Sequence, residues 1–303
     1  MPKSVNSREK DLSKVLVTIA DDNYFLYAIF CFDSLKYLDE TYRRVIIYVT
    51  EDSNPSKHQL LIERIAGLEV VIVPPKVNLV ANQKASYISG ATFMKLWLTD
   101  FIHPKADLII YFDPDVLFLR NLEKALGRIN QPQKFGAVSI PNSQGSHLGK
   151  PIGRYFNAGF LMINGQDFTF DLAKDYLVKN PKAKELKYME QDVLNMCYHD
   201  EYEELSNTFN YFPYKPLNAK QVIFPHVVHF VGSNKPWNSS YTSIYHLLWI
   251  KKYNSFCRKM HLDKLSINLR YRNFRHALMS VLFRFTLIGG ALRLLNSVKK
   301  RIS

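Results

Sequence analysis

Two carboxylates flank a proline at the point where a predicted buried strand ends. The segment from Tyr111 to Phe118 is Y-F-D-P-D-V-L-F, which places Asp113 and Asp115 inside an apolar run. Residues two apart on an extended backbone point to the same side, and Pro114 ends the hydrogen-bond ladder because it has no N–H. A divalent cation such as Mg²⁺, Mn²⁺ or Ca²⁺ relieves the repulsion between such carboxylates. The pattern therefore indicates either a metal site or an ordinary Asp-Pro-Asp turn.

A second acidic cluster follows another predicted strand. The segment A-D-D-N-Y (residues 20–24) comes at the end of the apolar run 14–20, and D-P-D comes after the run 108–112. No glycine-rich phosphate-binding loop follows either run, which argues against a nicotinamide-dependent dehydrogenase and against a P-loop ATPase. Acids in place of glycines indicate phosphates held through a metal, which can bridge a diphosphate and stabilise its charge as it leaves a sugar.

Strand and helix patterns alternate over the first 140 residues, and they predict the fold class. The order indicates an α/β fold with a largely parallel, doubly wound sheet flanked by helices. In such sheets ligands bind at the carboxyl ends of the strands, where both acidic clusters fall. The predicted strands are 14–20, 44–49, 70–73 and 108–112; the predicted helices are 24–38 capped by Asn23, one from Ser53 or Asn54 to Gly67, and 91–101.

Length and cysteine content limit the class of protein. With 303 residues and 47% hydrophobic residues the chain can bury a full core, as one large domain or two small ones. Cys31, Cys197 and Cys257 match neither a disulfide framework nor a zinc site, so we expect reduced thiols in a cytosolic protein. The first residues lack the apolar core of a signal peptide, so secretion is not expected.

The net charge of +13 is concentrated at the C-terminus. From Arg258 onward there are eleven Lys and Arg against one acid, Asp263. This tail, 258–303, mixes arginines with aliphatic residues, and Arg284 and Arg293 interrupt what would otherwise be a membrane span. It is typical of amphipathic helices that lie on an anionic membrane surface. A helix docked on the domain with a basic face is the alternative, and a nucleic-acid-binding arm is disfavoured because no base-reading motif is present.

Three motifs in the second half of the chain carry further polar residues. They are Y-F-N-A-G-F-L-M-I-N (155–164), Y-M-E-Q-D-V-L-N (188–195) and H-F-V-G-S-N-K-P-W (229–237). Gly159 allows a ligand to approach the backbone closely, and Lys235 could neutralise phosphate. Each motif taken alone is better explained without a ligand, by a bulge glycine, a capped helix, a core histidine or a solvated lysine.

Together with A-D-D-N-Y and D-P-D, in this order, these motifs resemble glycosyltransferase family 8, most closely its bacterial lipopolysaccharide galactosyl- and glucosyltransferases. The resemblance covers about residues 15–250. It implies a glycosyltransferase A fold, with a single Rossmann-like, doubly wound mixed sheet flanked by helices, in a catalytic domain over 13–257. It also implies a UDP-sugar donor, Mn²⁺ or Mg²⁺, and retention of anomeric configuration.

The resemblance also implies residue roles. Asp113, Asp115 and His229 would bind the metal, and Lys235 would offset charge on the leaving diphosphate. Gln191 would lie nearest the reacting face of the sugar. The donor would be contacted by Ala20, Asp21, Asn23, Lys95, Asp113, Asn157, Ala158, Gly159, Glu190, Gln191, Gly232 and Lys235.

Two positions depart from the family pattern, and one step of the reaction stays open. Lys95 stands where the bacterial enzymes carry arginine, and lysine cannot form the planar two-pronged hydrogen bond that arginine forms. Glu190 stands where the family usually has aspartate. The amide of Gln191 is a poor nucleophile, so a front-face route is preferred, in which the leaving phosphate helps to deprotonate the acceptor. Asp192 is a candidate nucleophile only if it lies close under the anomeric carbon.

The expected activity is metal-dependent transfer of galactose or glucose from UDP-galactose or UDP-glucose to an oligosaccharide or glycolipid such as lipopolysaccharide. The expected location is the cytoplasm, peripheral on the inner face of the cytoplasmic membrane. A nucleotide-sugar phosphohydrolase using the same carboxylates and a basic nucleic-acid-binding module are the alternatives. The ordered motifs argue against both, so no nucleic-acid partner is expected.

Overall fold

The chain divides into two compact units. Unit 1 comprises Met1–Tyr211 and Phe224–Val227, and unit 2 comprises Phe212–Ile223 and Val228–Ser303. The computed structural model describes residues 13–35, 42–51, 59–65, 67–76, 90–102, 104–127, 129–140, 143, 145–149, 152–213, 225–238 and 243–263.

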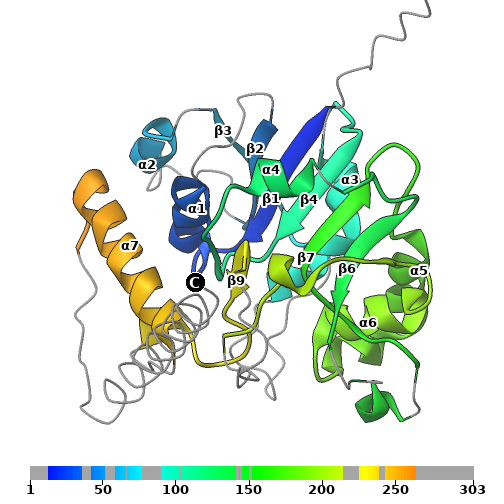
Figure 1. Cartoon of the computed structure of the whole chain (residues 1–303). Coiled ribbons are helices and arrows are strands. Elements are labelled where there is room, and N and C mark those ends of the chain that lie inside the picture. Colours follow the sequence, from blue (N-terminus) through cyan, green and yellow to red (C-terminus); the bar gives the residue numbers. More distant parts are fainter. Residues whose placement is uncertain are drawn as a thin grey trace, which may run out of the picture. The chain divides into compact units, whose positions relative to one another are not determined.

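Unit 1 is built on a seven-stranded sheet with the strand order β3-β2-β1-β4-β7-β6-β8 (Figure 1). Its strands are β1 (Lys14–Ala20), β2 (Tyr42–Val49), β3 (Leu68–Val73), β4 (Leu108–Phe112), β6 (Phe135–Ser139), β7 (Phe156–Asn164) and β8 (Glu203–Glu204). Strand β1 runs parallel to β2 and β4, whereas β7 runs antiparallel to β4 and β6. The sheet is therefore mixed, as predicted, with a short separate strand β5 (Val116–Phe118) after D-P-D.

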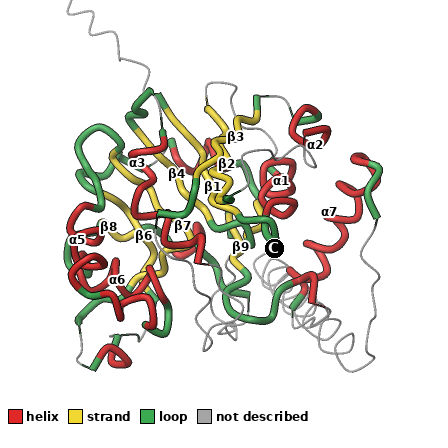
Figure 2. The backbone as a smooth tube through the Cα atoms, turned by 180° about the vertical axis from the view of Figure 1, so that it is seen from behind, coloured by secondary structure: helices red, strands yellow, loops and turns green. Residues whose placement is uncertain are grey.

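The helices of unit 1 lie on both faces of this sheet. Helix α1 contacts β1 and β2, whereas α6 contacts β7 and packs beside α5, as Figure 2 shows in red. The helices are α1 (Phe25–Ser34), α2 (Gln59–Glu63), α3 (Leu98–Phe101), α4 (Leu122–Leu126), α5 (Asp171–Lys179) and α6 (Met189–Tyr198), and the 3-10 helices are η3 (Gly90–Trp97), η4 (Ser146–Leu148), η5 (Pro181–Glu185) and η6 (Asn207–Phe209).

Burial on both faces explains why the strands are continuous apolar runs rather than alternating ones. Alternate residues of β1, such as Val15 and Val17, join the core that includes η3 and α6. Leu16 points to the other face and is also fully buried. The predicted strands 14–20 and 108–112 are confirmed to the residue, and the other two are longer by two residues at their N-terminal ends.

Two predicted helices differ from the structure. Helix α1 is not capped by Asn23: the Oδ1 atom of Asp21 accepts from the backbone N–H groups of Asn23 (3.0 Å) and Tyr24 (3.2 Å). The predicted helix 91–101 is a 3-10 helix over its first seven residues, where η3 begins one residue earlier, at Gly90, and it is α-helical only in α3. Six residues of η3 are buried, so packing outweighs helix propensity there. Of the predicted helix ending at Gly67, residues 52–58 lie outside the described part.

Unit 2 contains most of strand β9 (Val227–His229), the 3-10 helix η7 (Pro236–Asn238) and helix α7 (Ile244–Met260). Helix α7 ends at His261, which has a left-handed backbone (φ 56°), and the N–H of Leu262 donates to the carbonyl of Cys257. The predicted start of the tail at Arg258 thus falls inside α7, and residues 264–303 of the tail lie outside the described part. Among the described helices none has the length and apolar character needed to cross a membrane.

Candidate active site

The two aspartates of D-P-D lie in the turn between β4 and β5, at the carboxyl end of β4. One oxygen of the Asp113 carboxylate and one of the Asp115 carboxylate lie within 4.8 Å of each other. Asp115 is buried, whereas the side chain of Asp113 is 22% exposed. Two converging carboxylates, one of them open to solvent, fit the oxygen ligand set that Mg²⁺ and Mn²⁺ prefer.

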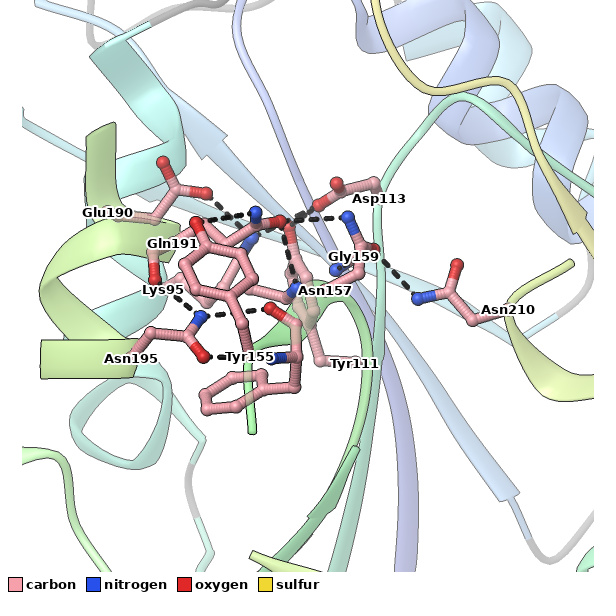
Figure 3. A network of polar contacts seen from close by, with 12 residues as sticks. Lys95, Tyr111, Asp113, Tyr155, Asn157, Gly159, Glu190, Gln191, Asn195 and Asn210 are labelled. Atoms are coloured by element: carbon pink, nitrogen blue, oxygen red, sulfur yellow. Dashed lines mark hydrogen bonds and ion pairs between the residues drawn. The ribbon is translucent and has the colours of Figure 1, made fainter. Parts of the chain in front are cut away.

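A fully buried lysine connects this turn to helix α6 (Figure 3). The ammonium of Lys95 lies 2.9 Å from Oε1 of Glu190 and 3.3 Å from Oδ1 of Asp113. It also lies 4.7 Å from the centre of the Tyr111 ring, whose hydroxyl donates to the same oxygen of Asp113 at 2.5 Å. Burial alone would lower the pKa of Lys95, but the charges of Asp113 and Glu190 outweigh it, and the pKa is raised. Lys95 therefore stays charged and holds the two carboxylates.

Glu190 has accepting capacity left for a ligand. Its Oε1 atom pairs with Lys95, while its buried Oε2 atom accepts no hydrogen bond from the described residues. A buried carboxylate oxygen without a donor is costly, so a ligand hydroxyl that donates to it would be favoured. That Glu190 contacts the donor stays a prediction.

The side-chain amide of Gln191 is fixed at both ends, as Figure 3 shows. Its Oε1 atom accepts from the Asn157 side chain at 2.8 Å and from the backbone N–H of Ala158 at 3.2 Å. Its Nε2 atom donates to the hydroxyl of Tyr155 at 2.9 Å. The predicted donor-site residues of β7 and α6 therefore lie together in one hydrogen-bonded network.

An irregularity in β7 makes this arrangement possible. Val138 of β6 pairs with Asn157, but its neighbour Ala137 pairs with Leu161, so residues 158–160 are skipped in the β6 pairing. The skipped residues leave the N–H of Ala158 for Gln191. Such bulges commonly re-aim side chains beside functional sites.

Asn157 is held by its own set of bonds. Its Oδ1 atom accepts from the N–H of Gly159 at 2.9 Å and from the side chain of Asn210 at 2.7 Å. The carbonyl of Gly159 in turn accepts from the N–H of Asp113 at 2.9 Å. The N-A-G motif is thereby tied directly to the D-P-D turn.

Asp192 lies in a different environment from Gln191. It is fully buried, and its Oδ1 atom accepts from the Tyr155 hydroxyl at 2.5 Å and pairs with Nε2 of His147 at 2.7 Å. Its Oδ2 atom accepts from the backbone N–H of Tyr188 at 2.8 Å. A nucleophile must reach the substrate, whereas this carboxylate is enclosed by three donors, which is the geometry of an anchor.

Four further residues of the network were not predicted from the sequence. Three of them are Tyr155, His147 and Asn210, whose contacts are with residues distant in the sequence and are not predicted by a local motif. Asn195 accepts from the N–H of Phe156 at 2.8 Å and donates to the carbonyl of Gln191 at 2.8 Å. Its spacing of four residues from Gln191, on one helix face, was the available signal.

The residues of A-D-D-N-Y that were predicted to contact the donor lie at the carboxyl end of β1. Ala20 is buried, Asp21 is half-buried and caps the following turn, and Asn23 is exposed. Because β1 pairs in parallel with β4, these residues and Asp113 share one edge of the sheet.

Unit 2 carries the other predicted site residues. His229 is buried at the end of β9, and Gly232 has a left-handed backbone (φ 82°), which glycine adopts without strain. The ammonium of Lys235 donates to the carbonyl of Phe230 at 2.9 Å. That these residues complete the metal and diphosphate site stays a prediction.

Helix α7 supports this loop through a buried histidine. The Nδ1 atom of His246 lies 2.9 Å from the Ser243 hydroxyl, and its Nε2 atom lies 3.5 Å from the carbonyl of Asn234. Burial lowers the pKa of His246 to about 4, so the ring is neutral at pH 7. A carbonyl only accepts, so Nε2 carries the proton and Nδ1 accepts from Ser243.

Comparison with known proteins identifies the family. The sequence profile described as glycosyl transferase family 8 matches residues 15–240. The chain belongs to glycosyl transferase family 8. The family and the fold that the motifs predicted are thereby confirmed.

Relatives of this glycosyltransferase agree with that assignment, and the solved structure of another protein agrees with the fold. General stress protein A of Bacillus subtilis is 25% identical over 257 residues, which are 76% of this chain and 90% of that protein. Lipopolysaccharide 1,3-galactosyltransferase of Salmonella typhimurium is 25% identical over 171 residues, which are 49% of this chain and 50% of that protein. The galactosyltransferase LgtC, solved with donor and acceptor sugar analogs, superposes with a TM-score of 0.66 at 20% identity, covering 81% of this chain and 99% of that chain.

Replacing the buried lysine tests the ion-pair network of this glycosyltransferase. Lys95→Met leaves the carboxylates of Asp113 and Glu190 without their shared cation, so we expect the free energy of unfolding to fall by about 3–5 kcal/mol. Chemical denaturation followed by circular dichroism measures it. The matched control is Lys134→Met, which removes an exposed lysine paired with Glu201 and should cost less than about 1 kcal/mol. Equal effects of the two substitutions would contradict the assigned role of Lys95.

The depressed pKa of His246 predicts an acid-sensitive stability. The unfolded chain takes up a proton on His246 below about pH 6.5 and the folded chain only near pH 4, so stability falls as the pH falls through this window, by up to ~3 kcal/mol. The variant His246→Phe lacks this titration. The difference in unfolding free energy between wild type and variant should therefore shrink from pH 7 to pH 4. A difference that does not change with pH would refute the assignment.

Proposed function

We propose that this glycosyltransferase is a metal-dependent, retaining hexosyltransferase that moves galactose or glucose from a UDP-sugar to a saccharide acceptor. The observation that carries the proposal is the convergence of the Asp113 and Asp115 carboxylates at the end of β4, beside the network that fixes Gln191. In this proposal Asp113, Asp115 and His229 hold Mn²⁺ or Mg²⁺. When bound, the cation would neutralise charge on the diphosphate as it leaves the sugar.

The chain's own residues supply binding and orientation. Ala20, Asp21 and Asn23 would contact the nucleoside, and the loop of Gly232 and Lys235 would close over the diphosphate, with Lys235 offsetting its charge. The donor sugar would lie against Asn157, Ala158 and Gly159, where Glu190 Oε2 is ready to accept from a hydroxyl. Gln191, with its amide held at both ends, would face the reacting carbon.

Retention follows best from a front-face route in this site. The amide of Gln191 is a weak nucleophile, and the Asp192 carboxylate is buried with donors on both of its oxygens. A covalent intermediate on either side chain is therefore disfavoured. An oxygen of the leaving phosphate would instead take the proton of the acceptor hydroxyl as the new bond forms on the same face.

The acceptor proposed here is a cell-surface saccharide such as lipopolysaccharide or lipooligosaccharide. Two relatives are named lipopolysaccharide 1,3-galactosyltransferase and lipopolysaccharide 1,2-glucosyltransferase, which supports this class of acceptor. Release of UDP from UDP-galactose and from UDP-glucose, with and without a lipooligosaccharide, separates the two donors. Rapid turnover that needs no acceptor would instead indicate a phosphohydrolase.

Binding of UDP and metal gives the first test. At ligand concentrations near 100 times Kd, UDP with Mn²⁺ should raise the melting temperature by roughly 5 °C or more. Asp113→Asn and Asp115→Asn should abolish this shift because they weaken the metal site. The matched control Asp100→Asn, which alters an exposed aspartate paired with Lys174, should keep it. If the wild-type protein shows no shift with UDP and Mn²⁺, the proposed function is wrong.

The basic tail leads to a proposal for where in the cell this enzyme acts. We propose that residues 264–303, which carry nine Lys and Arg and no acid, bind the anionic inner face of the cytoplasmic membrane. Holding the enzyme there would raise the local concentration of a lipid-linked acceptor.

Truncation after Asp263 tests this anchor while leaving α7 and its C-terminal turn intact. The truncated protein should no longer sediment with vesicles that contain anionic lipid, whereas the full chain should do so in a salt-dependent manner. Stabilisation by UDP and Mn²⁺ should be unchanged. Continued sedimentation of the truncated protein would show that the tail is not the anchor.

A further inference from the structure

The buried carboxylate of Asp192 joins three separate segments of unit 1. It accepts from the hydroxyl of Tyr155, which precedes β7, and from the backbone of Tyr188, which precedes α6. The third partner is His147, in the short helix η4, with Nε2 at 2.7 Å. Because an ionised carboxylate only accepts, Nε2 of His147 is a donor in this pair.

The turn that carries His147 is shaped to lie against Tyr155. Gly145 and Gly149, on either side of η4, both have left-handed backbones (φ 62° and 88°). A Cβ atom on Gly145 would lie 2.9 Å from Ile152 and 3.0 Å from the Tyr155 ring, so only glycine allows this approach. The imidazole of His147 also packs edge-on against the rings of Tyr155 and Tyr188.

The hydroxyl of Tyr155 forms hydrogen bonds with both Asp192 and Gln191, so it links the orientation of the Gln191 amide to that of the Asp192 carboxylate. A tyrosine hydroxyl has one proton, and Tyr155 donates it to Asp192 at 2.5 Å. Burial and the charge of Asp192 both raise the pKa of Tyr155, so that proton stays in place. The hydroxyl can therefore only accept from Gln191, which places Nε2 of the amide toward Tyr155 and Oε1 toward Asn157.

We propose that His147 is a positioning residue that sets the orientation of the Gln191 amide through Asp192 and Tyr155. This inference rests on the proposed place of Gln191 at the reacting sugar. His147 is 20% exposed and lies on a short turn, whereas Asp192 is fully buried. Removing its donor leaves one position on a buried carboxylate unfilled, so the carboxylate and the Tyr155 hydroxyl reorient and the amide loses its fixed direction.

Kinetics separates positioning from simple loss of stability. His147→Leu should lower kcat about tenfold or more and change KM for the UDP-sugar much less, because the other proposed donor contacts are kept while the amide at the reacting carbon is misdirected. His147→Gln places an amide N–H near the former Nε2 and should recover most of kcat. In a Gln191→Ala background, His147→Leu should change kcat by less than about twofold, because both substitutions act on one group. Effects that multiply would overturn the proposal.

Tyr155→Phe is the second variant in the same chain of contacts. It removes a single oxygen, and its loss in kcat should likewise vanish in the Gln191→Ala background. The matched control is His199→Leu, which removes another partly exposed histidine that pairs with a carboxylate, Asp200, at 3.0 Å, and whose Nδ1 atom lies 3.1 Å from the backbone carbonyl of Asn195 rather than from its side-chain amide. Its effect on kcat should be small, and a loss equal to that of His147→Leu would overturn the assigned role of His147.

The side-chain amide of Gln191 gives a readout that does not depend on turnover. In ¹⁵N-labelled full-length protein its resonance pair is identified by its disappearance in Gln191→Ala. The pair should shift in His147→Leu and stay in place in His147→Gln and His199→Leu. An unshifted pair in His147→Leu overturns the inference. If wild type turns over no UDP-sugar, the proposed function fails, whereas the amide resonance still decides whether His147 positions Gln191.

Discussion

The fold of unit 1 depends on one buried cation. Lys95 is fully enclosed, and an isolated ammonium in that environment would be strongly unfavourable, so its two carboxylate partners must come to it. Asp113 comes from the end of β4 and Glu190 from the start of α6, and Lys95 itself comes from η3. Three segments that are distant in sequence are thereby fixed around one charge. The ammonium of Lys95 therefore holds both the Asp113 carboxylate at the proposed metal site and the Glu190 carboxylate at the proposed sugar site.

Ion pairs and neutral hydrogen bonds organise different residues of the candidate site. The D-P-D turn and Glu190 are organised by ion pairs, whereas Gln191 and Asn157 are organised by neutral hydrogen bonds with defined directions. Asp192 lies directly after Gln191 in the chain, but donors on both of its carboxylate oxygens set it apart from Glu190, whose Oε2 atom accepts no hydrogen bond from the described residues. In the proposed mechanism Gln191 would face the substrate, whereas Asp192 would hold the surrounding segments in place.

The sequence was informative where a signal is local. Strands β1 and β4 were predicted from continuous apolar runs. The acidic residues at their carboxyl ends were predicted to form a ligand site because ligands of open α/β sheets bind there. Gln191 and Asn157 were identified through motif resemblance, and the structure brings them together. Asn195 was missed although its helix spacing was visible.

Contacts between distant segments were not predictable in the same way. His147 and Asp192 are 45 positions apart, and Asn210 and Asn157 are 53 apart, so no spacing reveals their pairing. The cap of α1 was assigned to Asn23 because Asn is a common cap, but Asp21 forms the turn instead. Helix η3 departs from α-helical geometry because it is packed on most of its sides, which local propensity does not describe.

D-P-D is proposed here as a metal site for a nucleotide-sugar reaction. The most direct measurement is anomalous diffraction at the manganese edge from crystals of the full chain grown with UDP and Mn²⁺. We expect a single strong anomalous peak within coordination distance of the Asp113 and Asp115 carboxylates, next to the diphosphate of UDP. UDP bound with no such peak at these carboxylates, or a peak at another site, would contradict it.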